Sequence, residues 1–186
     1  MGEKRDSEAF LAQRIRNKDP LASKALYGAY AGYLTGVCTR YLSDPDDVKD
    51  VLHDSFLKIF GAMHSFEYKG PGSLKAWLTK IVVNESLRFI RDTYRHELVT
   101  LSEEIEMTAA AEEPEIRTVP MEILHRMISE LPTGYRTVFN LYVFEGRSHK
   151  DISALLNIKE ASSASQFHRA KALLAARIKE YQSNNP

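Results

Sequence analysis

Five polar side chains between residues 80 and 95 are spaced so that they would share one face of a helix. Lys80, Asn84, Arg88, Arg91 and Arg95 follow one another at intervals of four, four, three and four residues. At about 100° per residue, these positions fall within roughly 80° of one another. Cations hold phosphate groups, and an amide can hydrogen-bond a base edge. The spacing therefore indicates nucleic-acid contact, and the alternative is a solvated charged face.

A glycine-rich loop precedes this stretch and carries aromatic side chains. Phe66, Tyr68 and Lys69 stand beside two glycines, so the loop would place aromatic rings next to a cationic surface. Aromatic stacking and positive charge suit unstacked bases better than closed duplex. The alternative is an ordinary turn whose aromatic side chains pack into the core. Ser73 is expected to cap the helix that follows.

A row of carboxylates has a different chemistry. Asp47, Asp50 and Asp54 recur at intervals of three and four residues, with His53 beside them, so a helix would carry them on one side. Such a row repels DNA and suits a basic protein partner or solvent. Carboxylates also serve catalysis and metal binding, but no convergent partner and no H-x-x-x-H or H-E-x-x-H spacing accompanies them. We therefore expect no enzyme activity, no metal site and no cofactor.

Net charge is a misleading statistic here, because charge is segregated along the chain. The 25 basic and 25 acidic residues cancel, yet residues 41–60 hold five aspartates against two lysines, and residues 147–180 hold seven Lys or Arg against three acids. Cys38 is the one cysteine among 186 residues, which excludes an internal disulfide framework and fits the reducing cytoplasm. No apolar run resembles a signal peptide or is long enough for membrane insertion. We expect a cytoplasmic protein.

Apolar periodicity and turn signals predict an all-α fold. Asp-Pro pairs at 19–20 and 44–45 each supply an N-cap and a first-turn proline for a helix. Glycines at 28, 32 and 36 predict close packing of the first of these helices against a neighbour. Six glutamates and weak periodicity after Thr100 predict a flexible acidic linker. We expect two small helical domains, residues 1–96 and 119–186, joined by a linker at 97–118.

The last part of the sequence has the segment lengths, capping residues and turn residue of a helix-turn-helix. Ser148 and Asp151 resemble a capping box for a short helix over 148–156, and Asn157 can adopt a left-handed turn before a longer helix. The first turns of that longer helix are expected to expose side chains that reach groove edges and phosphates. These side chains are Ser162, Ser163, Ser165, Gln166 and Arg169.

Together and in this order, these stretches resemble the extracytoplasmic-function (ECF) sigma factors of bacterial RNA polymerase. Four segments carry the resemblance: DPDDVKDVLHDSFLKIF, GPGSLKAWLTKIVVNESLRFIRD, LPTGYRTVFNLYVFEGRSHKDISALLNI and SSASQFHRAKALL. The first is similar to the family's polymerase-binding helix, and the second to the element that melts and reads the minus-ten promoter element. The third and fourth are similar to the last sigma domain and its recognition helix.

The resemblance implies a transcription initiation factor with sigma region 2 in the first domain and sigma region 4 in the last. It assigns contact with a basic coiled-coil clamp of core RNA polymerase to Asp47, Asp50, His53 and Asp54. It assigns non-template-strand recognition at the minus-ten element to Ser73, Lys80, Asn84, Arg88 and Arg91, with loop 66–72 holding an extruded base. It assigns major-groove binding at the minus-thirty-five element to Ser162, Ser163, Ser165, Gln166 and Arg169. The implied partners are core RNA polymerase, promoter DNA and an anti-sigma factor.

Two departures from the family pattern concern promoter choice. His53 stands where glutamine is frequent, and the run from Ser162 to Gln166 lacks two cations that are common there. The main alternative is a stand-alone helix-turn-helix regulator that binds duplex DNA, which has no use for the acidic row. A helical adaptor that binds only proteins has no use for the basic stripe. A helical nuclease would need a convergent acidic metal site, which this sequence does not show.

Overall fold

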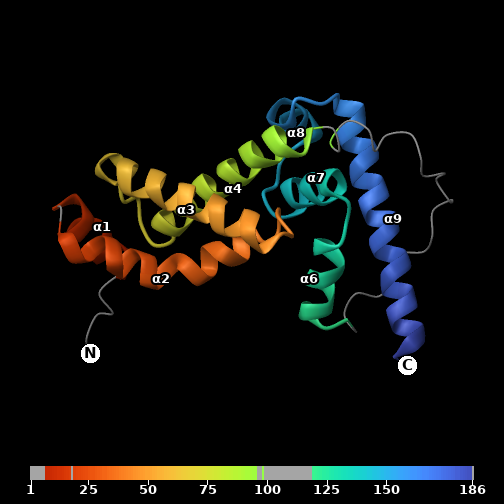
Figure 1. The fold of residues 1–186 in the computed structure, drawn as a ribbon, viewed down its shortest axis with the longest axis horizontal. Helices are drawn as coiled ribbons and strands as arrows, with labels where there is room; N and C mark the ends of the chain where they lie inside the picture. The colour runs from red at the N-terminus through yellow and green to blue at the C-terminus, as the bar shows by residue number, and fades with distance from the viewer. Residues whose placement is uncertain (1–6, 18, 96–97, 99–118, 186) are drawn as a thin grey trace. The chain divides into compact units, whose positions relative to one another are not determined.

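The computed structural model describes residues 7–17, 19–95, 98 and 119–185, and this part of the chain is built of helices without strands. The all-α class is thereby confirmed (Figure 1). The helices are α1 (Ser7–Arg16), α2 (Pro20–Cys38), α3 (Pro45–Ala62), the 3-10 turn η1 (Met63–Ser65), α4 (Ser73–Thr93), α6 (Met121–Ser129), α7 (Thr133–Val143), α8 (His149–Leu156) and α9 (Glu160–Asn184).

Local capping signals determine where several helices begin and end. The carboxylates of Asp19 and Asp44 accept hydrogen bonds from backbone N–H groups at the starts of α2 and α3, and a proline follows each cap. Ser148 and Asp151 form the reciprocal capping box of α8. Asn157 ends α8 in the left-handed conformation with a φ of 54°. All four local predictions are confirmed.

The chain divides into two compact units. Unit 1 comprises Met1–Thr39 and Asp44–Ser86, and unit 2 comprises Arg40–Ser43 and Leu87–Pro186. The last part of α4 is thus counted with unit 2. The expected linker at 97–118 lies outside the described residues apart from Leu98, so the domain limits given above stay a prediction.

In unit 1, helices α1 and α3 pack against α2 (Figure 1). The 3-10 turn η1 contacts both α1 and α3. The buried side chains of α2 include Leu26, Leu34 and Cys38, and those of α3 include Val51 and Ile59. Burial raises the pKa of the Cys38 thiol, which keeps it protonated and suits a core side chain.

The glycines of α2 do not pack closely against another helix in the described part of the chain. A Cβ atom added to Gly28, Gly32 or Gly36 would meet no heavy atom within 4 Å, and all three residues are exposed. The expectation of close packing is therefore wrong. Spacing alone could not reveal this, because small residues allow close approach without requiring it.

Replacing Gly32 with alanine is therefore expected to stabilise the protein by about 0.5–1 kcal/mol. Alanine restricts the unfolded chain and fits the helix, and open space surrounds the position. Gly72→Ala is the matched control, because the φ of Gly72 is +85° and an alanine there is strained. Urea unfolding should show opposite shifts for the two variants, and destabilisation by Gly32→Ala would contradict the reasoning.

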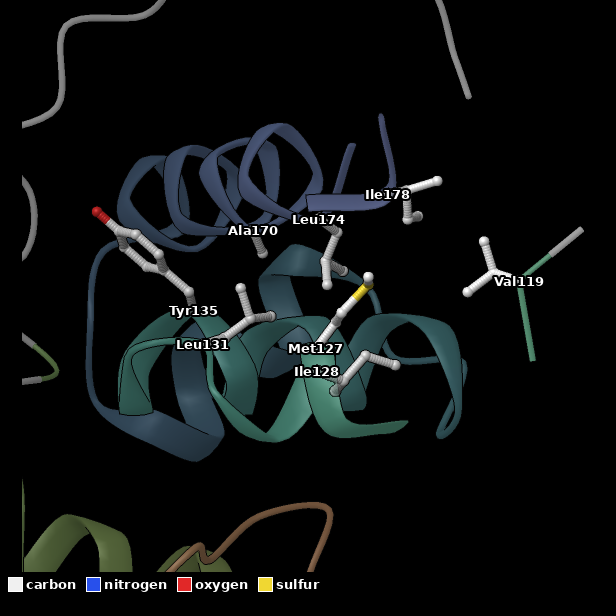
Figure 2. Packing of buried hydrophobic residues seen from close by; sticks show 8 residues of the cluster. All are labelled: Val119, Met127, Ile128, Leu131, Tyr135, Ala170, Leu174 and Ile178. Carbon is white, nitrogen blue, oxygen red and sulfur yellow. The ribbon is translucent and has the colours of Figure 1, made fainter. Parts of the chain in front are cut away.

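The core of unit 2 lies between α9 and the segment that contains α6 and α7 (Figure 2). Met127 and Ile128 of α6 and Tyr135 of α7 meet Leu174 and Ile178 of α9 in one buried cluster. Helix α8 packs against both α7 and α9. This packing holds α8 and the start of α9 as a helix-turn-helix.

Candidate nucleic-acid and protein interfaces

The acidic row lies on the outer side of α3. Asp50, His53 and Asp54 are exposed, and Asp47 is half-buried. The opposite side of the helix is buried through Val51, Ser55 and Ile59, among other residues. The row is therefore held in place by the core on one side and offers carboxylates on the other.

An apolar side chain extends the acidic row toward the end of α3. Leu57 is 59% exposed and follows Asp54 by three residues, so the two share a helix face. Phe60, near the end of the same helix, is 37% exposed. Sequence reasoning missed Leu57, although its position between the buried Phe56 and Ile59 shows that it lies off the buried stripe.

The cationic stripe lies on α4 as expected, but its members differ in accessibility. Lys80, Asn84 and Arg88 are exposed, and Arg91 is half-buried. The Nη1 atom of Arg91 donates a hydrogen bond of 2.8 Å to the backbone oxygen of Leu155. Arg91 is therefore engaged within unit 2, whereas Asn84 offers its amide to the outside.

Loop 66–72 is shaped by its aromatic side chains and two glycines. Phe66 is buried and packs on Trp77, with ring centroids 5.1 Å apart, so this aromatic belongs to the core. The hydroxyl of Tyr68 is buried and has no hydrogen-bond partner among the described residues. Gly70 and Gly72 have φ values of +121° and +85°, which residues with a side chain rarely adopt. The backbone of the loop therefore adopts a conformation that requires glycine at two positions.

Ser73 does not cap α4 in the expected manner. Its hydroxyl donates to the backbone oxygen of Gly70 at 2.6 Å and accepts from the backbone N–H of Lys69 at 3.2 Å. The side chain therefore closes the loop on itself instead of accepting from the first turn of the helix. The expectation that Ser73 caps the helix is wrong, and its proposed DNA contact must compete with these two bonds.

The first turn of α4 is capped by a residue from α1. The carboxylate of Glu8 accepts hydrogen bonds from the backbone N–H groups of Gly72 at 2.7 Å, Leu74 at 3.4 Å and Lys75 at 3.3 Å. Sequence reasoning missed Glu8, because more than 60 residues separate it from the helix that it caps. No local spacing rule connects two such positions.

The helix-turn-helix is present, but two of its candidate contact residues are buried. Ser163 and Gln166 are 0% and 1% exposed. The Oγ atom of Ser163 lies 3.0 Å from Nδ1 of His149, and Nε2 of Gln166 donates a 2.8 Å bond to the backbone oxygen of Leu98. The expectation that both side chains are exposed is wrong in this structure.

The burial follows from the periodicity of α9. Ser163 and Gln166 precede Ala170 by seven and four residues, so they continue the buried row of Ala170, Leu174 and Ile178. Extending that row toward the N-terminus of the helix would have revealed this.

The outward side of the first turns of α9 is formed by other residues. Ser162, Ser165 and Arg169 are half-buried, while His168 and Lys171 are exposed. An Nη1 atom of Arg169 lies 3.5 Å from the Tyr135 hydroxyl, so this side chain lies beside the core of unit 2. His168 is not among the predicted contact residues, although its position between Phe167 and Arg169 places it in the same turns of the helix.

No three His, Cys, Asp or Glu side chains in the described ranges gather into a group that could hold a metal ion. Within the same ranges, no helix combines the length and apolar character needed to cross a membrane.

Comparison with known protein families gives two matches along the chain. The model for Sigma-70 region 2 matches residues 26–96, and the model for Sigma-70, region 4 matches residues 121–174. The first match contains α3, loop 66–72 and α4, and the second contains α6 to α8 and the first turns of α9.

Several curated proteins of similar sequence carry the ECF designation. The ECF RNA polymerase sigma-E factor of Haemophilus influenzae is 25% identical over 183 residues, covering 90% of this chain and 93% of that protein. The ECF RNA polymerase sigma factor SigM of Bacillus subtilis is 28% identical over 153 residues, covering 79% and 91%. Among solved structures, CnrH in complex with the cytosolic domain of CnrY matches with a TM-score of 0.50 at 23% identity, covering 94% of this chain and 99% of that one. The last match shows a similar fold.

Proposed function

This chain belongs to the ECF sigma factors of bacterial RNA polymerase, and we propose that it binds core RNA polymerase and directs it to specific promoters. The observation that carries the proposal is the opposite charge of two helix faces. The outer face of α3 offers carboxylates, whereas α4 offers cations and an amide. A regulator that binds duplex DNA by itself needs only the second kind of surface.

The polymerase contact is proposed for α3. Asp47, Asp50, His53 and Asp54 would meet a basic coiled coil of the largest polymerase subunits. Leu57 would add an apolar contact beside the charges, because it is exposed on the same helix face. Charge complementarity steers encounter, and burial of an apolar side chain adds affinity.

The minus-ten element is proposed to meet α4 and loop 66–72 as the duplex opens. Asn84 would read a base edge of the non-template strand, because its amide is exposed and can both donate and accept. Lys80 and Arg88 would hold phosphates on either side of it. Arg91 would contribute after it leaves the Leu155 oxygen, and Ser73 would act at the edge of the loop.

The minus-thirty-five element is proposed to meet the start of α9 in the major groove. Ser162 and Ser165 are half-buried and can reach a groove edge, and the exposed Lys171 can hold a phosphate. Arg169 would add charge from the same turns. Ser163 and Gln166 would support the turn from inside, because both are buried.

The remaining expectations follow from family membership. We propose that the protein acts in the cytoplasm, carries out no catalysis and needs no cofactor. An anti-sigma factor is proposed as a regulator that would compete with polymerase for the same surfaces.

Reconstitution with core RNA polymerase tests the proposal. The full chain should co-purify with core polymerase and should support run-off transcription from a subset of a genomic promoter library. Core polymerase without the chain is the control and should give no specific start sites. A stand-alone regulator would instead retard duplex promoter DNA without polymerase and would yield no transcripts.

A further inference from the structure

The carboxylate of Glu8 joins three parts of unit 1. It accepts from the backbone N–H groups of Gly72, Leu74 and Lys75 in loop 66–72 and α4, and from the hydroxyl of Tyr30 in α2 at 3.0 Å. Charge-assisted bonds of this kind are stronger than neutral ones. One side chain of α1 thus fixes the end of the loop, the start of α4 and the face of α2.

The position of Glu8 is itself held by the packing of α1. Leu11 and Ala12 of α1 are 8% and 4% exposed, so the helix is anchored in the core of unit 1. Nε of Arg14 donates a 2.7 Å bond to Oδ2 of Asp19, the N-cap of α2. The carboxylate of Glu8 therefore belongs to a helix whose position is fixed by packing and by the Arg14–Asp19 bond.

The start of α4 depends on this carboxylate because no local group replaces it. The first turn of α4 contains no acidic residue, and Gly72 has no side chain. The hydroxyl of Ser73 is bonded within the loop. Three N–H groups at the positive end of the helix dipole therefore share one distant anion. Without it, a loop with two glycines at positive φ would sample other forms.

We propose that Glu8 is a positioning residue for promoter opening, which holds loop 66–72 in the form that receives an extruded base. The proposal rests on the proposed function, since it assumes that this loop meets the non-template strand. The buried hydroxyl of Tyr68, which has no hydrogen-bond partner among the described residues, is a group that an entering base edge could satisfy. Glu8 would act only through the backbone N–H groups that it binds, without touching DNA.

Electrostatics alone predicts that removing the charge of Glu8 strengthens DNA binding, whereas the positioning role predicts that it weakens promoter opening. Removal of a negative charge from a DNA-binding domain raises its affinity for DNA at all sequences. Loss of a positioning group lowers the capture of one base. Asp92 is an exposed acid of α4 that lies outside the loop, so Asp92→Asn measures the electrostatic effect with the same carboxylate-to-amide change as Glu8→Gln.

The test is an abasic scan of the non-template strand across the minus-ten element, with the full chain bound to core polymerase. In the wild type, removal of the captured base should weaken open-complex formation by about 5- to 150-fold, the effect of losing one stacked base. In Glu8→Gln, the intact promoter should already be weakened by about 5- to 30-fold, and removal of that base should have almost no further effect. Asp92→Asn should bind all templates somewhat more tightly and keep the wild-type pattern.

Each outcome decides the proposal. Thermal unfolding and core-polymerase capture, measured on both variants, show that the protein is folded and loaded. A Glu8→Gln holoenzyme that keeps the wild-type abasic pattern, or that loses affinity equally at every position, would overturn the positioning role while leaving the proposed function intact. A wild-type holoenzyme that is indifferent to every abasic position would overturn base capture by the loop, and with it the role of Glu8.

Discussion

Replacement of Asp50 and Asp54 together by arginine is expected to abolish binding to core RNA polymerase, with a loss of affinity of about 100-fold or more. Both carboxylates are exposed on α3, and two like charges facing a basic partner cost several kcal/mol. The buried side of α3, with Val51 and Ile59, is untouched. Pull-down with core polymerase measures the loss, and circular dichroism measures the fold.

The matched control places the same charge change elsewhere. Glu122 and Glu180 are exposed acids of unit 2, so their replacement by arginine alters net charge equally without touching α3. This control should retain core binding. Equal capture by the Asp50→Arg, Asp54→Arg variant and the wild type would exclude the acidic row as the polymerase contact.

Asn84→Ala is expected to change which minus-ten sequences are accepted. Asn84 is exposed on α4 one turn from both Lys80 and Arg88. Its amide would hydrogen-bond one base, so the loss should be about 1–3 kcal/mol at a single base position and small elsewhere. Open-complex formation on all single-base variants of the promoter, at two salt concentrations, measures the effect.

Arg88→Ala is the comparison for Asn84→Ala. A phosphate contact reads no base, so its removal should weaken all promoter variants to a similar extent and lower the salt dependence by about one counterion. Arg91 is less suitable, because it is half-buried, whereas Arg88 is exposed. If Asn84→Ala weakened open-complex formation equally on all promoter variants, base reading by Asn84 would be excluded.

Much of the fold could be predicted because its signals are local. The caps at Asp19, Asp44 and Ser148 lie within three residues of the N–H groups that they bind. The left-handed turn at Asn157 depends on one residue. The exposed acids of α3 and the exposed face of α4 at Lys80 and Asn84 follow from helical spacing around a buried stripe.

The errors arose where long-range packing decides. The polarity of Gln166 predicts an exposed side chain, but the packing of α9 buries it and gives it the Leu98 oxygen as a partner. Ser73 has the right type for a cap, but Glu8 from another helix takes that role. Both cases concern hydrogen bonds between residues far apart in sequence, which spacing rules do not contain.

The exposed glycines of α2 bear on how long the free protein would persist in a cell. Gly28, Gly32 and Gly36 each weaken a helix interior by about 0.5–1 kcal/mol relative to alanine. Together they amount to about 1.5–3 kcal/mol, and differences of 1–2 kcal/mol change cellular abundance several-fold through chaperones and proteases. When it is bound to no partner, the chain would therefore be degraded faster than a variant with alanine at these positions. Once its synthesis stops, the transcription that depends on it would end sooner.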